Sequence, residues 1–293
     1  MRSSGTLLCL GSGAAFGAMA VFGKLAYAEG ATVGTLLSVR FVIAAALFWL
    51  LAAGAVRGVQ RRDVAAGLGL GGCYALQAGL YFAALERIDA SLLSVLVYTF
   101  PAMVATAAIA LGRERIDRRR LAALALASGG VVLVVGGAGA GALDALGAAL
   151  GLAAAVVYST YTLVSEGVSR RVSPQALAAI VCSGAAIVLT AGSALLGELR
   201  PAELTAAGWG WLTCLAAVST VGAISLFFAG LRRVGPTTAS ILATVEPVVT
   251  VGLAFAVFGE TLGPIQLAGG GLVVVAVLVL NPGTRRKAAW ADR

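Results

Sequence analysis

The sequence predicts an all-α integral membrane protein of ten transmembrane helices, arranged as two inverted five-helix repeats with both termini in the cytoplasm. Three observations lead to this prediction. The 293 residues are 60% hydrophobic and 12% charged, whereas a soluble domain carries about 25% charged residues. Residues 81–114 occur again, in modified form, at 227–260. The basic residues that flank these two copies lie at opposite ends of them.

Ten apolar segments follow one another along the chain, separated by charged residues or by proline and glycine. A membrane-spanning helix needs about 20 residues, so ten of them use nearly the whole chain. The predicted spans are 5–24, 31–53, 64–85, 90–111, 120–137, 143–164, 174–196, 207–230, 236–258 and 263–280. The first begins like a signal peptide, but its apolar run continues past Ala20. We expect it to be retained as a helix, because a duplicated chain needs an even number of helices.

Glycine and alanine are frequent in these segments, which allows helices to approach closely. Three predicted helices carry two glycines at the GxxxG spacing, and we expect these pairs to pack against other helices of the same chain. The pairs are Gly13 and Gly17, Gly67 and Gly71, and Gly147 and Gly151.

The repeat divides the chain into residues 1–140 and residues 141–293, the second ending in a short basic tail. A shift of 146 positions superposes the two copies without a gap. The superposed pairs include Phe82 and Phe228, Arg87 and Arg233, Pro101 and Pro247, and Glu114 and Glu260. Because each half contains an odd number of spans, the second half must enter the membrane in the opposite direction.

The distribution of basic residues sets the predicted orientation. Of the 21 lysines and arginines, Arg40 falls inside a span, and Lys24, Arg87 and Arg200 fall on one side of the membrane. The others fall on the opposite side, if ten spans are counted from the N-terminus. Basic loops stay in the cytoplasm, which places both termini there and predicts a multi-pass protein of the cell membrane.

The repeated stretches resemble a known family. The first copy, YFAALERIDA followed by a proline and LGRE, and the second, FFAGLRRVGPTTA with EP, FGETLGP and QLAGGGL, are similar to the EamA-type permeases of the drug/metabolite transporter superfamily. The resemblance covers essentially the whole chain and implies two five-helix modules. It also implies transport of amino acids, other metabolites or cationic drugs, while related branches exchange nucleotide sugars or triose phosphates. Phe100 stands where the second copy has Glu246, so any role of that glutamate belongs to one half only.

Arg40 and Glu246 are ionisable residues near the middle of predicted spans. An ion at the bilayer centre costs about 3 kcal/mol, so neither should face lipid. Two interpretations stay open. They present a positive and a negative pole to a substrate, as suits the carboxylate and ammonium of an amino acid, or they satisfy each other and nearby backbone groups.

Aromatic and amide side chains indicate a cavity. Tyr74, Gln77 and Tyr81 share one helical face, although Tyr81 is also explained by the interfacial position that tyrosines favour near helix ends. Tyr98, Tyr158 and Tyr161 lie deeper, where a phenol needs a hydrogen-bond partner. The candidate substrate-binding residues are therefore Arg40, Tyr74, Gln77, Tyr98, Tyr158, Tyr161 and Glu246.

Pro101 and Pro247 occupy equivalent positions, which we expect to be mid-helix. A proline there removes a backbone hydrogen bond and bends the helix. The bend acts either as a flexing point for a gate or as a fixed kink that shapes the cavity. Glu114 and Glu260, at equivalent helix ends, are expected to hold the following turn in place.

Several functions are excluded or disfavoured. The chain contains no histidine, which excludes histidine-based catalysis and zinc-histidine sites. No phosphate-binding GxxxxGK[ST] stretch is present, so no ATP site or ATPase subunit is implied. The four cysteines lie in apolar runs without CxxC spacing, so we expect neither a metal nor another cofactor. The net charge of +8 falls in loops beside anionic lipid headgroups and does not indicate nucleic acid.

The predicted function is transport rather than catalysis: a secondary carrier that moves small amphipathic metabolites by alternating access. Export of amino acids is favoured, aromatic ones above all. The alternatives are efflux of aromatic or cationic drugs in exchange for protons and, from a different class, a channel or a membrane scaffold without transport activity.

Overall fold

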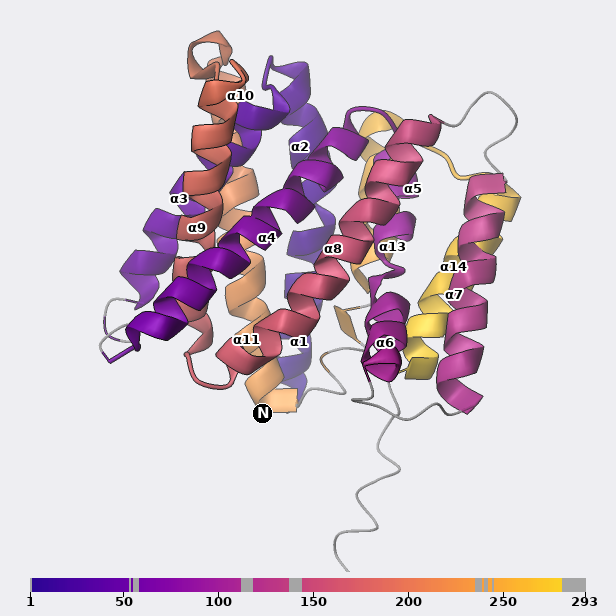
Figure 1. The fold of residues 1–293 in the computed structure, drawn as a ribbon. Helices are drawn as coiled ribbons and strands as arrows, with labels where there is room; N and C mark the ends of the chain where they lie inside the picture. Colours follow the sequence, from indigo (N-terminus) through magenta and orange to yellow (C-terminus); the bar gives the residue numbers. More distant parts are fainter. Residues whose placement is uncertain are drawn as a thin grey trace, which may run out of the picture.

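The computed structural model describes residues 2–52, 54, 58–111, 118–136, 144–234, 239, 242–243 and 245–280. All regular structure in this part of the chain is helical (Figure 1). The helices are α1 Arg2–Gly17, α2 Met19–Ala28, α3 Val33–Ala52, α4 Arg61–Leu85, α5 Ala90–Val97, α6 Phe100–Ala110, α7 Arg118–Gly136, α8 Ala145–Ser169, α9 Pro174–Leu195, the 3₁₀ turn η1 Pro201–Glu203, α10 Ala206–Ala216, the π-helical turn η2 Ala217–Gly222, α11 Ala223–Val234, α13 Val245–Phe258 and α14 Pro264–Leu280.

The helices have the length and composition of membrane spans. In the described part of the chain, six segments are long and apolar enough to cross a membrane, namely Ser4–Ala28, Val33–Ala52, Arg61–Leu85, Ala145–Ser169, Pro174–Leu195 and Ala206–Val234. Four shorter apolar helices accompany them, Ala90–Val104, Leu121–Val134, Val245–Phe258 and Pro264–Val279. Leucines on the helix surfaces are exposed, as at Leu50 and Leu195, which suits contact with lipid. The expectation of an all-helical membrane protein is confirmed.

Both prolines lie near the described start of a helix. The predicted span 90–111 is divided into α5 and α6, and Pro101 lies in the first turn of α6. Pro247 likewise lies in the first turn of α13. Proline has no N–H to donate, and the first turn of a helix is the place where none is needed. Pro101 therefore begins α6 instead of lying inside it. Residue 244 lies outside the described part of the chain, so a bend at Pro247 stays a prediction, as does the role of either proline in a gate.

Helices that are far apart in the sequence lie side by side. Figure 1 shows α3 against α9, α4 against α8, α1 against α11 and, at the edge of the bundle, α7 against α14. The first half of the chain thus packs mainly on the second. The charged loop around Arg113 and Glu114, the boundary at residues 140–141 and the basic tail lie outside the described residues.

Close contacts between α7 and α14 give the direction in which these helices pack. A Cβ built on Gly269 of α14 would lie 2.8 Å from the side chain of Val134, and one on Gly130 of α7 would lie 2.8 Å from that of Val273. Residue numbers therefore rise along α14 as they fall along α7, so the two helices are antiparallel. The helices α3 and α9 are also antiparallel, since Gly34 adjoins Ser193 while the indole N–H of Trp49 donates to Ser183 Oγ at 2.9 Å.

The three GxxxG pairs pack inside the chain, as expected. Gly13 and Gly17 of α1 touch α13, Gly67 and Gly71 of α4 touch α9, and Gly147 and Gly151 of α8 touch residues 87–96, in the turn after α4 and in α5. The closest backbones meet at Gly71, where an added Cβ would lie 2.5 Å from the carbonyl oxygen of Val181. A side chain at that position would force α4 and α9 apart.

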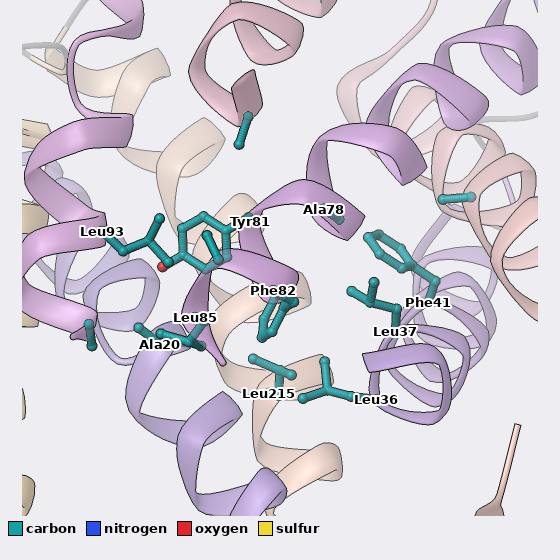
Figure 2. Packing of buried hydrophobic residues seen from close by; sticks show 14 of the residues in the cluster. Ala20, Leu36, Leu37, Phe41, Ala78, Tyr81, Phe82, Leu85, Leu93 and Leu215 are labelled. Carbon is teal, nitrogen blue, oxygen red and sulfur yellow. The ribbon is translucent and has the colours of Figure 1, made fainter. Parts of the chain in front are cut away.

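The core brings together large side chains from α3, α4 and α10. Figure 2 shows Leu36, Leu37 and Phe41 of α3 with Phe82 of α4 and Leu215 of α10. Fully burying a residue such as Phe82 contributes about 2 to 3 kcal/mol relative to exposing it to water. This cluster fixes the rotation of α3 and α4 about their axes, which determines where Arg40 and Tyr74 point.

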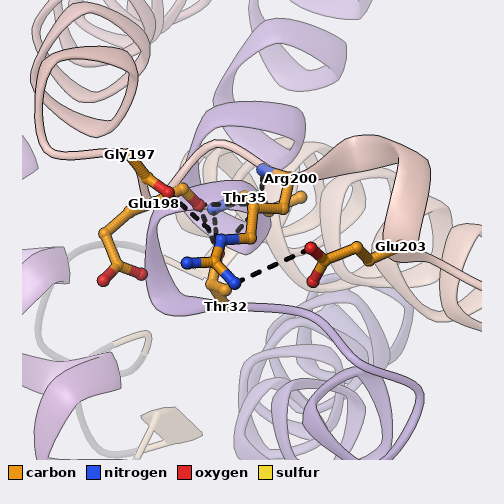
Figure 3. Close-up of polar contacts among 6 residues, drawn as sticks. All are labelled: Thr32, Thr35, Gly197, Glu198, Arg200 and Glu203. Carbon is orange, nitrogen blue, oxygen red and sulfur yellow. Dashed lines mark hydrogen bonds and ion pairs between the residues drawn. The ribbon is translucent and has the colours of Figure 1, made fainter.

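One end of the bundle is fastened by polar contacts between α3 and the segment after α9. Figure 3 shows that the Thr32 and Thr35 hydroxyls donate to the Glu198 carbonyl and that the Arg200 N–H donates to Thr35 Oγ1 at 2.7 Å. The N–H of Thr35 also donates to Thr32 Oγ1 at 3.0 Å, which satisfies one of the N–H groups that the start of α3 leaves without a partner. Together these contacts hold α3 at this end.

Candidate substrate cavity

A cavity of about 510 Å³ lies between helices of the two halves. All seven candidate substrate-binding residues border it, and so does Pro101, while Pro247 does not. Their role in binding remains a prediction. This volume suits a single small ligand, since binding pockets for such molecules typically occupy about 300 to 1,000 Å³.

Arg40 forms the positive pole of the cavity. It lies in the middle of α3 and is 2% exposed. Its Nε–H donates to Thr220 Oγ1 of η2 at 2.9 Å, and its guanidinium carbon lies 5.0 Å and 5.4 Å from the ring centroids of Phe41 and Phe82. Aromatic faces stabilise a cation by attraction to the ring electrons. Among the described residues no carboxylate forms an ion pair with Arg40, so its charge is not neutralised by the protein there.

Glu246 forms the negative pole, in the first turn of α13. Its backbone carbonyl accepts a hydrogen bond from Thr250 Oγ1 at 3.1 Å, and the Thr250 hydroxyl also approaches the Gly17 carbonyl at 3.0 Å. These contacts fix the start of α13 against α1. The carboxylate of Glu246 forms no ion pair with a basic residue in the described part of the chain. Arg40 and Glu246 therefore share one cavity without pairing with each other.

Aromatic rings form a continuous wall that begins beside Arg40. Phe41 meets Tyr74 edge to face at 5.6 Å, and Tyr74 lies 5.3 Å from Tyr161. The Tyr161 ring is stacked on Tyr158 at 6.2 Å, and Tyr158 lies 4.5 Å from Phe100. Such arrays offer large apolar faces with polar hydroxyls at the ring edges. The wall can therefore accommodate an aromatic group and also form hydrogen bonds to it.

The Tyr98 hydroxyl is hydrogen-bonded to the protein backbone and does not offer its proton to the cavity. It donates to the Ala243 carbonyl at 2.7 Å, two residues before α13 begins. A buried phenol requires such a partner. Tyr98 therefore links α5 to the segment that leads into α13. Because its hydroxyl is already hydrogen-bonded, only its ring is available to contact a ligand.

Positions related by the repeat recur around the cavity. Each of the following pairs is separated by 146 positions and borders the cavity with both members: Ala78 and Ile224, Tyr81 and Phe227, Phe82 and Phe228, Val97 and Ala243, and Phe100 and Glu246. The walls from the two halves correspond in position but differ in chemistry. The difference is greatest where an aromatic ring in one half corresponds to a carboxylate in the other.

Some lining residues were missed from the sequence. Tyr81 was placed on the same helical face as Tyr74 and Gln77, but it was left out of the candidate residues because its place near a helix end also suits the membrane interface. It is 6% exposed and borders the cavity. Phe227 and Phe228 also border the cavity, and their correspondence to Tyr81 and Phe82 would have indicated this.

The cavity extends toward the end of the bundle where α8 ends and α9 begins, since Pro174 and Leu177 line it. The opposite end contains a charged cluster. Lys24 Nζ lies 2.6 Å from Glu260 Oε1, and the N–H and hydroxyl of Ser91 donate to Glu260 Oε2 at 3.1 and 3.2 Å. Glu260 therefore joins α2 to the start of α5, rather than only holding its own turn.

The carboxyl of Glu260 has a pKa below its ordinary value. Burial by itself would raise this pKa, but the hydrogen bonds from Lys24 and from the backbone N–H groups of Ala90 and Ser91 outweigh it. Each of these donors favours the ionised carboxylate. The cluster is thus fully formed at neutral pH.

In the described part of the chain, no group of three or more cysteine, aspartate and glutamate residues is arranged to hold a metal ion. The four cysteines are unpaired. The chemistry that these walls offer is recognition by charge, hydrogen bonding and stacking.

Comparison with known proteins gives consistent matches. A family model described as the EamA-like transporter family matches residues 3–136 and again residues 145–281. The chain is 27% identical over 286 residues to the uncharacterized transporter YcbK of Bacillus subtilis (strain 168), covering 94% of this chain and 92% of that one. It is 26% identical over 212 residues to an uncharacterized transporter of Archaeoglobus fulgidus, covering 72% and 74%. A solved crystal structure matches its fold with a TM-score of 0.65 at 21% identity, covering 98% of this chain and 100% of that one.

Proposed function

The chain belongs to the EamA-like transporter family, and from this membership we propose that it is a secondary carrier of small amphipathic metabolites, with export of aromatic amino acids as its favoured activity. The protein is a membrane transporter, as are the relatives described above by name. In our proposal the cavity is the substrate site and the cell membrane is its location. Lipid and the small-molecule substrate are its partners.

One observation carries the choice of substrate: Arg40 and Glu246 border the same cavity and do not pair with each other. A free amino acid carries a carboxylate and an ammonium group, and these complement the two poles. An aromatic side chain fits the wall formed by Tyr74, Tyr158 and Tyr161. A nucleotide sugar would need several basic groups, and among the described lining residues only Arg40 is basic.

Alternating access is proposed on the basis of inverted repeats comprising residues 1–140 and 141–293. In such carriers the substrate lies where the two repeats meet. The antiparallel packing of α7 on α14 supports this arrangement, because these helices are the fifth members of the two proposed repeats. The recurrence of equivalent positions around the cavity supports it independently. Ten spans with both termini in the cytoplasm complete the proposal, and transport is driven by a gradient or by exchange rather than by ATP.

Counterflow in proteoliposomes tests the proposal. Vesicles preloaded with unlabelled phenylalanine should accumulate labelled phenylalanine with saturation. Arg40→Gln and Glu246→Gln should each reduce uptake by about tenfold or more, since a hydrogen bond to a charged group contributes about 1.5 to 3 kcal/mol. The matched controls Arg200→Gln and Glu203→Gln change exposed residues at the end of the bundle and should leave uptake unchanged. Normal uptake by both cavity variants would reject the two-pole site.

A second candidate is efflux of aromatic or cationic drugs in exchange for protons. It is favoured by the position of Glu246, a carboxylate without a described ionic partner that shares its cavity with Tyr98 and Phe100. An aromatic amine would need the glutamate but not the arginine. Transport of labelled phenethylamine that is abolished in Glu246→Gln and unaffected in Arg40→Gln would favour this function over amino acid transport.

A further inference from the structure

The longest helical segment of the bundle, Ala206–Val234, contains an irregularity at the depth of the cavity. Residues Ala217–Gly222 form a π-helical turn between α10 and α11. Such turns are rare and occur frequently at functional sites. They rotate the residues that follow relative to a regular helix. The turn therefore changes which side chains of this helix face α3.

Thr220, within this turn, is fully buried. Its hydroxyl contacts two groups: the Leu215 carbonyl at 3.0 Å and Arg40 Nε at 2.9 Å. A carbonyl only accepts a hydrogen bond and a guanidinium only donates. The hydroxyl proton must therefore point to Leu215, which leaves an oxygen lone pair for the Nε–H of Arg40. The π turn brings the Leu215 carbonyl within reach and so fixes the direction of the hydroxyl.

This contact determines which part of Arg40 remains for a ligand. A guanidinium binds a carboxylate through two parallel N–H groups, either along the edge that includes Nε or across the two terminal amino groups. Thr220 accepts the hydrogen bond from Nε, and the rings of Phe41 and Phe82 lie against the guanidinium. Tyr74, which also lines the cavity, is a hydrogen-bonding neighbour of Arg40. The terminal amino groups, beside Tyr74, are then the two donors that face a carboxylate in the cavity.

We propose that Thr220 is a positioning residue, which holds Arg40 so that the transporter selects substrates bearing a carboxylate. The inference rests on the proposed transport function and adds to it a residue outside the cavity lining. Thr220 acts through Arg40 and does not touch the substrate. It therefore affects selectivity between ligands more than it affects their transport in general.

Thr220→Val tests the inference, because it preserves the shape of the side chain and removes the hydroxyl. The KM for phenylalanine should rise by about tenfold, as expected for losing one hydrogen bond to a charged group, whereas inhibition by phenethylamine, which lacks the carboxylate, should stay unchanged. Thr220→Ser keeps the hydroxyl and should restore the wild-type ratio. Thr190→Val is the matched control, since the Thr190 hydroxyl is buried without a partner among the described residues. An equal loss for both ligands in Thr220→Val, or no loss for either, would overturn the proposal.

A binding measurement separates this inference from the transport function. Phenylacetate, a carboxylate without an ammonium group, should raise the melting temperature of purified wild-type protein and of Thr220→Ser, but not of Thr220→Val. Thr220→Ala replaces Thr220→Val if the valine variant does not fold. If wild-type protein fails to transport phenylalanine but shows this pattern, the transport proposal fails and the role of Thr220 stands. Equal stabilisation of all variants by phenylacetate rejects the role of Thr220, whatever the transport assay shows.

Discussion

Arg40 shows how a single charge is accommodated in the middle of a membrane protein. Moving such an ion to the bilayer centre costs about 3 kcal/mol on insertion scales, and the described residues offer Arg40 no carboxylate. A threonine hydroxyl and two aromatic faces stabilise it instead. Because these contacts are neutral, the positive charge remains available to a ligand. The charge of Lys24, at the end of the bundle, is instead neutralised by an ion pair with Glu260.

We predict that the Glu260 cluster contributes a pH-dependent part of the stability. The pKa of Glu260 lies below its ordinary value in the folded protein. Its contribution is therefore complete above the ordinary carboxyl range and is lost as the pH falls through the folded pKa. At neutral pH, Glu260→Gln should lower the free energy of unfolding by about 1 to 2 kcal/mol.

Thermal melting in detergent at a series of pH values measures this effect. The difference between wild type and Glu260→Gln should shrink as the solution becomes acidic. Glu203→Gln is the control, because its partner Arg200 is 3.6 Å away and both side chains are more than half exposed; such pairs contribute little. A difference between wild type and Glu260→Gln that is constant with pH would contradict the assignment.

Helix pairs in this protein are held together where glycines allow backbones to meet. The contact between α7 and α14 is built on Gly130 and Gly269, and a Cβ on either would lie within 2.7 Å of the carbonyl oxygen of the other. A backbone atom cannot move aside as a flexible side chain can. The separation of the two helices is thus set by the absence of two side chains.

Adjacent glycines in α7 provide a sharp test. Gly130→Ala should destabilise the protein by about 1 to 3 kcal/mol, the range found for overpacking. A Cβ on Gly129 meets nothing within 4 Å, so Gly129→Ala should be neutral or stabilise the helix by up to about 1 kcal/mol. Melting temperatures of the two variants check this, and equal values would show that the seam between α7 and α14 is not tightly packed.

At the scale of the whole molecule, the question is how the two halves are oriented. The antiparallel direction of α7 and α14 places the first residues of these helices at opposite ends of the bundle. Arg118 begins α7, and Thr261 lies shortly before α14; both are exposed. The proposed inverted repeats require these two positions to face opposite sides of the membrane.

We predict that single cysteines at these two positions react from opposite sides. Each cysteine is introduced after the four native cysteines have been replaced, and is then treated with a membrane-impermeant maleimide. Arg118→Cys should be labelled in inverted vesicles, where the cytoplasmic side is accessible. Thr261→Cys should be labelled in intact cells. Glu203→Cys, in the turn after α9, should behave like Thr261→Cys. Labelling of both test positions from the same side would reject the inverted arrangement and, with it, alternating access between two such halves.

Much of this organisation follows from local sequence. The apolar segments predict the helices to within a few residues in most cases, as for α3 and α9, because helix formation in a membrane depends on composition over about 20 residues. Spacing within one helix places Tyr74 and Gln77 on a common face. The seven candidate residues were chosen on such grounds, and they border one cavity.

Other features depend on contacts between distant segments. No local pattern distinguishes a proline that bends a helix from one that begins it, as Pro101 does. Sequence likewise left open whether Arg40 and Glu246 pair, and it did not indicate the π turn that carries Thr220.

The sequence by itself determined that this chain is a duplicated helical membrane protein, and it identified most of the polar groups of its cavity, because composition and periodicity act within single helices. Tertiary structure alone decided that the two charges stay apart, that Tyr81 faces inward and that Thr220 holds Arg40. These features depend on the rotation and separation of helices, which are set by packing between residues more than a hundred positions apart.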